Sequence, residues 1–471
     1  MQLSYARPVV SAVFDDPNLV SAAGLVPLMA LAERAGLRVL ADEHLTVPGD
    51  KGANAGLKVS SLVAGMCAGA DSIDDMAVLR HGGMGRVFNH GYAPSTLGSF
   101  LRGFTFGHVR QLDAVAARFL GGLARRTPLL GGIDQLVLVD VDDTIIEVHG
   151  GAKQSADFGY NGVRGLNALL ATITIGGAAP VIAAQRLRRG GSGSSRGAAR
   201  IVADTLATIK RLRAGRVADG SGNTAPPVLL RADSAFYAHT VVNTAIWAGA
   251  QVSVTVRMDP AVKAAIASIE ETSWTTIEYP QAIYDEASGT WISRAQVAEI
   301  PFLAFRSQPK TQRVPGRLVV RRIPDANHRA GDQQASLFQV WRFHAFFTTS
   351  NLDTITADQV HRGHAIIEQV NADLKSSALA HMPSGVFNAN AAWLVLAVVA
   401  FNLTRAAATL SGADLTRATT PTIRRKLINI PARAATSARR VTLHLPAAWP
   451  WQHAWTQLFN HTCGPPGIAT T

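Results

Sequence analysis

The stretch Leu136-Val-Leu-Val-Asp-Val-Asp-Asp-Thr-Ile-Ile-Glu-Val148 decides the fold, because it is a long apolar run with three acids near its centre. Its continuous run of apolar residues predicts a strand over 136–148. Successive side chains of a strand point to opposite faces, so Asp140 and Asp142 share one face and Asp143 points to the other. The run therefore predicts a strand that presents two carboxylates on one side of a sheet.

Further apolar runs place this strand in a mixed sheet. The predicted order is three strands, a helix, a strand, a second helix and a fifth strand. This order favours a central first strand that lies beside the fourth. We therefore expect Asp142 and Asp233 side by side at adjacent strand ends. The other strands are predicted at 169–176, 179–186, 227–233 and 251–257, and the helices around Val202, Leu206, Ile209 and Leu212 and near 238–249.

A third acid belongs to a later predicted helix, which a capping box of Thr356 and Gln359 would begin. Residues spaced three, four and seven apart share one helical face, here His361, His364, Glu368 and Lys375. An adjoining apolar face could pack on the sheet while this stripe faces a cleft. The alternative is a solvated stripe on a surface helix. The apolar face consists of Val360, Ile367, Val370 and Leu374.

Together the three acids predict a site for divalent cations. Two carboxylates from strand ends and a third from a helix can converge on one pair of cations. That arrangement is the smallest set of metal ligands needed to break and join phosphodiester bonds.

The rest of the chain divides into regions that differ in their predicted secondary structure. We expect helices up to about residue 130, which could contact DNA or serve as a scaffold. Short β-like pieces that include Trp274, Leu318 and Phe338 predict a β-rich insertion between the second and third acids. The predicted regions are a helical DNA-binding region at 1–130, core at 131–259, insertion at 260–350, core at 351–410 and a basic helical region at 411–471.

Composition indicates the class of partner. The formal net charge of +12 favours a polyanion, above all nucleic acid, over a merely basic soluble protein. Cys67 and Cys463 match no metal or redox spacing, which implies a reducing compartment. The apolar stretch 391–403 is too short to span a bilayer and predicts a buried helix. With no secretion signal evident, we expect a cytoplasmic protein without a membrane partner.

Several phrases of this sequence resemble the DDE transposases of the insertion-sequence-4 group, closest to the insertion-sequence 1380 family. The family's last signature places Tyr, Arg, Glu and Lys at the same spacings as the predicted stripe. This chain keeps Glu368 and Lys375 but has His361 and His364 at the Tyr and Arg positions. The phrases are Val139-Asp-Val-Asp142-Asp-Thr144, Glu147-Val-His149-Gly150, Ala152-Lys-Gln154, Gly159-Tyr160-Asn-Gly-Val-Arg164-Gly165 and Arg231-Ala-Asp233-Ser234-Ala-Phe236.

The resemblance implies an RNase H-like fold and cut-and-paste movement of an insertion sequence. Asp142, Asp233 and Glu368 would hold two Mg²⁺ ions, which Mn²⁺ could replace. The partners would be double-stranded DNA, both terminal inverted repeats and target, and a second copy of the chain in the DNA complex.

The resemblance also implies roles for neighbouring residues. Asp140 would support the metal ligands. Trp274 is the candidate to stack on a flipped base, with Trp291 and Trp341 as competitors. The expected DNA contacts are Lys375, His361, His364, Lys153, Tyr160, Arg164 and Trp274.

Two other functions compete. Asp140-Val-Asp142-Asp-Thr144 also matches the nucleophile loop of haloacid-dehalogenase-like phosphatases, in which Asp140 would attack phosphate. That family needs a late Gly-Asp-x-x-x-Asp motif, and Gly331-Asp332 is followed by Ser336 instead. The second alternative is an inactive or domesticated transposase that only binds DNA.

Overall fold

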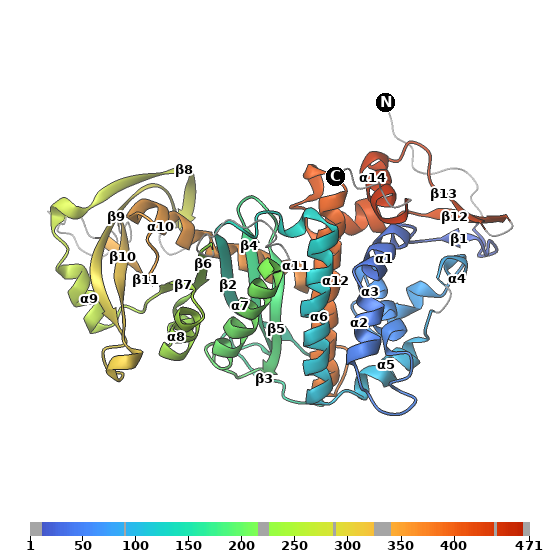
Figure 1. The fold of residues 1–471 in the computed structure, drawn as a ribbon, viewed down its shortest axis with the longest axis horizontal. Helices are drawn as coiled ribbons and strands as arrows, with labels where there is room; N and C mark the ends of the chain where they lie inside the picture. The colour runs from blue at the N-terminus through green and yellow to red at the C-terminus, as the bar shows by residue number, and fades with distance from the viewer. Residues whose placement is uncertain are drawn as a thin grey trace.

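The computed structural model describes residues 12–88, 91–214, 226–285, 289–324, 341–437 and 440–464. The molecule is elongated, with a helical block at one end, a sheet in the middle and a β-rich region at the other end (Figure 1). The predicted mixed α/β class with one large mixed sheet is confirmed. Gly331, Asp332 and Ser336, and the beginning of the β-like piece that includes Phe338, lie outside the described residues.

The central strand is β2 (Val137–Glu147), as predicted. It pairs antiparallel with β4 (Arg164–Ile175) and parallel with β6 (Val228–Ala232), so the first predicted strand does lie beside the fourth. Val141 is opposite Ala232, and the next residues along are Asp142 and Asp233. The other core strands are β3 (Asp157–Phe158) and β5 (Val181–Arg189), both beside β4, and β7 (Gln251–Thr255), beside β6.

Helices cover both faces of this sheet. α7 (Ala198–Ala214) packs near β4 and β5 on the face to which Asp143 points, and α8 (His239–Trp247) packs beside it. α11 (Ile366–Lys375) packs against β2 on the Asp142 face. The strands are therefore buried on both sides, which explains why they read as continuous apolar runs.

The predicted β-rich region is present, but its strands continue the core sheet instead of forming a sheet of their own. Phe347 of β11 pairs with Val254 of β7, and the described residues thereby form one ten-stranded sheet. This pairing covers an edge of β7 that would otherwise expose unpaired backbone groups. The elements are α9 (Pro260–Ala267), β8 (Thr275–Asp285), β9 (Thr290–Ala304), β10 (Val314–Pro324) and β11 (Trp341–Thr348).

The helical block is built around α12 (Phe387–Leu410), which contains the apolar stretch 391–403. By length and composition α12 could cross a membrane, but its apolar window is wholly buried inside the protein. The N-terminal helices pack around it, so distant parts of the chain share one core (Figure 1). They are α1 (Leu25–Arg34), α2 (Leu37–His44), α3 (Ala55–Ala68), α4 (Met84–Val87), α5 (Pro94–Arg102) and α6 (Phe106–Arg126).

The helical prediction for 411–471 needs a correction. This region contains the hairpin of β12 (Ala432–Ser437) and β13 (Arg440–His444), joined by β1 (Leu19–Val20) into a small sheet. Ala432 and Ala434 are buried while Arg433 between them is exposed, which is the two-residue period of a strand. The short α13 (Thr420–Ile423) precedes the hairpin, and α14 (Gln452–Cys463) follows it.

Candidate active site

Asp142 and Asp233 come directly after the last paired residues of β2 and β6, Val141 and Ala232. Asp233 follows the end of β6, but Asp142 lies in the middle of β2, which corrects the prediction that both acids stand at strand ends. Asp142 is half-buried, and its Oδ1 accepts a hydrogen bond of 2.7 Å from the backbone N–H of Asp143. Burial raises the pKa of Asp142 to about 6, and the charge of Asp233 contributes in the same direction. Burial also raises the pKa of Asp233, whose Oδ1 accepts from the Ala235 N–H at 3.0 Å. Carboxylates whose pKa is raised by burial and by a neighbouring carboxylate are typical of functional sites.

The helix that carries Glu368 is attached to Asp142 by a hydrogen bond. Asn371 lies one turn after Glu368 on α11, and its Nδ2 donates to Oδ2 of Asp142 at 2.8 Å. The pKa of the Tyr160 phenol is raised, mainly by partial burial of the hydroxyl and in addition by the negative charges around it. Those charges belong to Asp142, Asp143, Asp233 and Glu368. The charges of the three predicted acids therefore all act on Tyr160, whose side chain is 81% exposed.

The donor set suits a hard divalent cation, although the predicted convergence of three acids is incomplete. Among the described residues, no three His, Cys, Asp or Glu side chains are grouped closely enough to hold one ion. However, Oδ1 of Asn371 is buried without a hydrogen-bond partner, close to the carboxylate that its Nδ2 contacts. Mg²⁺ commonly takes one or two carboxylates and keeps several waters, so oxygen ligands in an open site fit it.

Asp140 is not available for chemistry. It is fully buried, and its two carboxylate oxygens accept from Nε and Nη2 of Arg231, both at 2.7 Å. Nδ1 of His364 lies 3.1 Å from Oδ1 of the same carboxylate. Asp140 therefore holds Arg231 and His364 beside the site, which is consistent with a supporting role. A buried carboxylate paired with Arg231 does not fit the nucleophile that the phosphatase alternative requires of Asp140.

Asp143 points to the opposite face, as predicted. It forms an ion pair with Arg188 of β5 at 2.6 Å and accepts a hydrogen bond from Asn167 of β4. Arg188 also donates to backbone carbonyls before α7. Asp143 thus stabilises the side of the sheet away from the site.

The helix predicted to begin at Thr356 and run through Lys375 is broken. α10 (Thr354–Arg362) begins one residue after Asp353, whose side chain caps it by accepting from the Thr356 N–H at 3.0 Å. A 3₁₀ turn at Gly363–Ala365 then separates α10 from α11. Nη1 of Arg231 donates to the carbonyl of Val360, which in a continuous helix would accept from residue 364. Competition from this buried arginine explains the break.

Because of this break, His361 does not share a face with Glu368, which corrects the one-face prediction. Its ring stacks on Phe346 with centroids 4.0 Å apart. Its two nitrogens contact the hydroxyls of Ser253 and Thr255, at 2.9 and 3.0 Å. Burial lowers its pKa to about 3, so the ring is neutral. His361 therefore packs in the wall beneath α10 instead of contacting phosphate.

His364 and Lys375 do lie beside the acids. The charge of His364 lowers the pKa of both Asp142 and Asp233, against the larger effect of burial. Burial lowers the pKa of Lys375, and the negative charge of Asp142 partly opposes this. The imidazole of His364 and the ammonium of Lys375 are thus close to the carboxylate pair.

Lys153 and Arg164, both predicted to contact DNA, are bound to backbone carbonyls. Lys153 donates to the carbonyl of Met382, and burial lowers its pKa. Arg164 donates to the carbonyl of Gly150 at 2.6 Å. Both residues hold the loop that presents Tyr160, and their contact with DNA stays a prediction.

Trp274, which was predicted to stack on a base, is already in contact with an arginine. The guanidinium of Arg322 lies between the rings of Trp274 and Trp341, 4.2 and 4.3 Å from their centroids. Trp291 differs, because it is 70% exposed and touches the ring of Tyr284 edge-on. Of the three candidates, Trp291 is the most exposed.

Two residues of the site were missed from the sequence. Arg231 is an arginine inside the buried strand β6, and such a residue requires a buried carboxylate partner. Asn371 stands one helical turn from Glu368 and could have been found by that spacing.

One comparison with known proteins gives a match. A family model described as Transposase DDE domain group 1 matches residues 3–462. No curated protein matches the chain.

Proposed function

The chain belongs to the family described as Transposase DDE domain group 1, and we propose that it cuts and rejoins DNA at the terminal inverted repeats of an insertion sequence. Membership supports a transposase, and hence DNA as the partner. The finer proposal is an RNase H-like enzyme of the insertion-sequence 1380 family that moves its element by cut-and-paste.

The observation that carries the proposal is that Asp142 and Asp233 each follow the last paired residue of two adjacent strands, while Asn371 of the helix that bears Glu368 is bound to Asp142. Asp142 has one oxygen bound to a backbone N–H and the other to Asn371, so its orientation is set before any ligand arrives. Such preorganisation is what a cation site on rigid elements needs.

We assign Asp142, Asp233 and Glu368 as holders of two Mg²⁺ ions, with Mn²⁺ as a substitute. Bound there, the ions would make water or a 3′-hydroxyl a stronger nucleophile and neutralise charge on the leaving oxygen. Asn371 orients Asp142, and its second amide atom is free to accept a further hydrogen bond or ligand.

Side chains beside the acids are the proposed contacts to the DNA phosphate. Lys375, whose pKa responds to the charge of Asp142, is the proposed phosphate contact on α11. His364 is held against Asp140, so its position is set by the Asp140–Arg231 ion pair. Tyr160, which is exposed in the turn between β3 and β4, is a further proposed DNA contact.

The proposed partners are duplex DNA and a second copy of the chain. The net charge of +12 favours association with DNA phosphates. We further propose residues 1–130 and 411–471 as DNA-contacting regions around the core, with 260–350 as the insertion. The protein would act in the cytoplasm on the DNA that carries its gene.

The test is metal-dependent cleavage of labelled DNA from the sequence flanking the gene. The unsubstituted protein should nick it at an element end with Mg²⁺ or Mn²⁺, whereas Asp142→Ala should bind but not cut. Glu147→Gln, at the exposed end of the same strand, is the matched control and should cut normally. Binding without cleavage by every protein would contradict the proposal and indicate a descendant that only binds DNA.

A further inference from the structure

A groove runs between α6 and α7, away from the carboxylates of the proposed active site. It consists of two adjoining hollows of about 150 and 560 Å³. Both hollows are lined by Ala117, Arg118, Thr208 and Arg211, so they form one continuous recess. None of the proposed cation ligands lines either hollow.

Small residues create this recess. On α6 they recur at helical spacing and lie on one face, and α7 contributes one more from the other side. Side chains without bulk leave room between two helices that would otherwise interdigitate. The small residues are Ala114, Ala117, Gly121 and Ala124 on α6, and Ala207 on α7.

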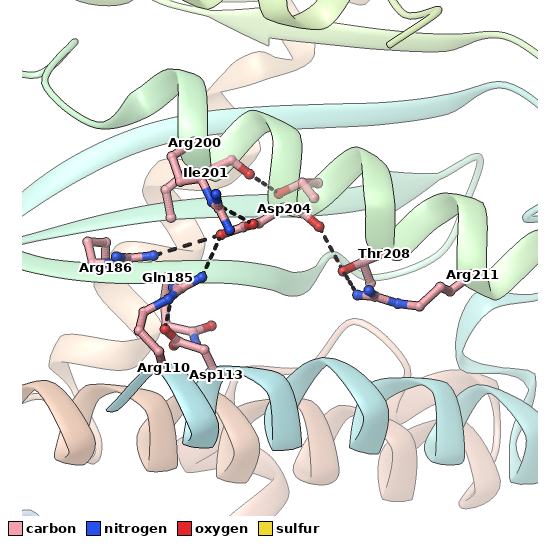
Figure 2. A network of polar contacts seen from close by, with 10 residues as sticks. Arg110, Asp113, Gln185, Arg186, Arg200, Ile201, Asp204, Thr208 and Arg211 are labelled. Atoms are coloured by element: carbon pink, nitrogen blue, oxygen red, sulfur yellow. Dashed lines mark hydrogen bonds and ion pairs between the residues drawn. The ribbon is translucent and has the colours of Figure 1, made fainter. Parts of the chain in front are cut away.

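The inner end of the groove is locked by a polar network (Figure 2). Arg110 of α6 forms ion pairs with Asp113 at 2.6 Å and with Asp204 of α7 at 3.2 Å. Gln185 of β5 donates to Asp113 at 2.6 Å, and Arg200 pairs with Asp204 at 3.0 Å. Figure 2 shows these side chains meeting between the two helices. Both acids near the groove are therefore already neutralised by arginines.

The outer part of the groove carries unpaired positive charge. Arg118, Arg125 and Arg211 are exposed, and none forms an ion pair with a carboxylate of the described residues. Arg118 and Arg125 are two helical turns apart, about 10 Å along α6, on one face. The lining holds four arginines (110, 118, 125 and 211) and two aspartates (113 and 204), so 4 − 2 leaves an excess of +2.

We propose that this groove binds the phosphate backbone of duplex DNA outside the catalytic site, an assignment that rests on the proposed function. Guanidinium groups bind phosphate oxygens through paired N–H donors. Arg118 and Arg125 on α6 lie across the small side chains from Arg211 on α7. One DNA backbone can therefore lie between them. The contact is with phosphate and therefore independent of base sequence.

The test is the salt dependence of DNA binding without divalent metal, so that cleavage plays no part. Labelled duplex is titrated with unsubstituted protein and with Arg118→Ala/Arg125→Ala/Arg211→Ala, and anisotropy is measured over a range of salt concentrations. The slope of log K against log salt should fall by about 0.9 for each phosphate that the variant no longer neutralises, so by about 3 in the triple variant. The corresponding triple Lys variant keeps the charge and should restore the slope.

The matched control removes three exposed arginines that line none of these hollows and lie outside residues 1–130 and 411–471, as Arg196→Ala/Arg257→Ala/Arg306→Ala. It has the same net charge as the test variant and should keep the original slope. Equal slopes in the test and control variants would overturn the groove assignment while leaving DNA binding intact. Failure of the unsubstituted protein to bind any duplex would overturn the assignment and the proposed function together.

Discussion

Ionisation of Asp142 should destabilise the metal-free protein. Its pKa is raised from 3.8 to about 6 by burial, so the folded state holds a proton that the unfolded chain releases. Stability therefore falls as the pH rises from about 4 to 6. Asp142→Asn should raise the free energy of unfolding by about 1–2 kcal/mol above pH 6, with the gain vanishing near pH 4. Thermal melting in EDTA at both pH values measures this, with Glu147→Gln as the charge control. A gain in the free energy of unfolding that grows toward low pH would contradict the predicted direction of the pH dependence.

The Asn371 amide should matter for cation binding as well as for cleavage. Asn371→Ala removes the donor that orients Asp142 and the buried Oδ1 beside it. Loss of a group that orients a metal ligand commonly lowers affinity or activity about 10–100-fold. Calorimetric titration with Mn²⁺ gives the affinity independently of cleavage. Gln369→Ala, on an exposed position of the same helix, is the control and should bind Mn²⁺ like the unsubstituted protein.

Removal of Arg231 should destabilise the whole protein. Arg231→Ala leaves the Asp140 carboxylate buried without its ion-pair partner, with only His364 still in contact with it. Breaking a buried ion pair from one side costs about 3–5 kcal/mol. Arg189→Ala, which breaks an exposed pair with Asp157, should cost less than about 1 kcal/mol. Urea denaturation compares the two, and similarly small decreases in stability would mean that Asp140 is solvated or neutral.

At the level of elements, the turn between α10 and α11 depends on a glycine. A Cβ at residue 363 would lie 2.8 Å from Nη1 of Arg231, which Asp140 holds in place. Gly363→Ala should therefore strain the turn and cost about 1–3 kcal/mol. Gly85→Ala, where a Cβ meets nothing within 4 Å, is the control and should be neutral or slightly stabilising. Equal melting temperatures for both variants would show that Arg231 can move aside.

The same turn shows where reading elements from the sequence succeeds and fails. The strands at 136–148 and 227–233 were predicted because their apolar runs are local. The break at residue 363 was not, because the group that captures the Val360 carbonyl is 129 residues away in sequence. Once the helix is broken, the spacing argument that placed His361 beside Glu368 no longer holds.

At the level of the whole molecule, the N-terminal helices and α12 fold as one unit. α12 packs against α1, α3, α5 and α6, so removing the first 130 residues would expose its apolar surface. A chain that begins at residue 131 should be insoluble, and co-expression of residues 1–130 as a separate chain should restore solubility. Fractionation after expression measures both. A soluble truncated chain that melts cooperatively would show that the core folds without this cover.

The sequence by itself determined the central strand, the carboxylates within it, the β-rich character before the last acid and the burial of 391–403. Each of these depends on residues near one another in the chain, where apolar period and spacing are sufficient. Only the tertiary structure decided that β11 extends the core sheet, that Arg231 neutralises Asp140 and that Asn371 holds Asp142. These contacts join residues far apart in sequence, and their energies depend on burial that no local pattern records.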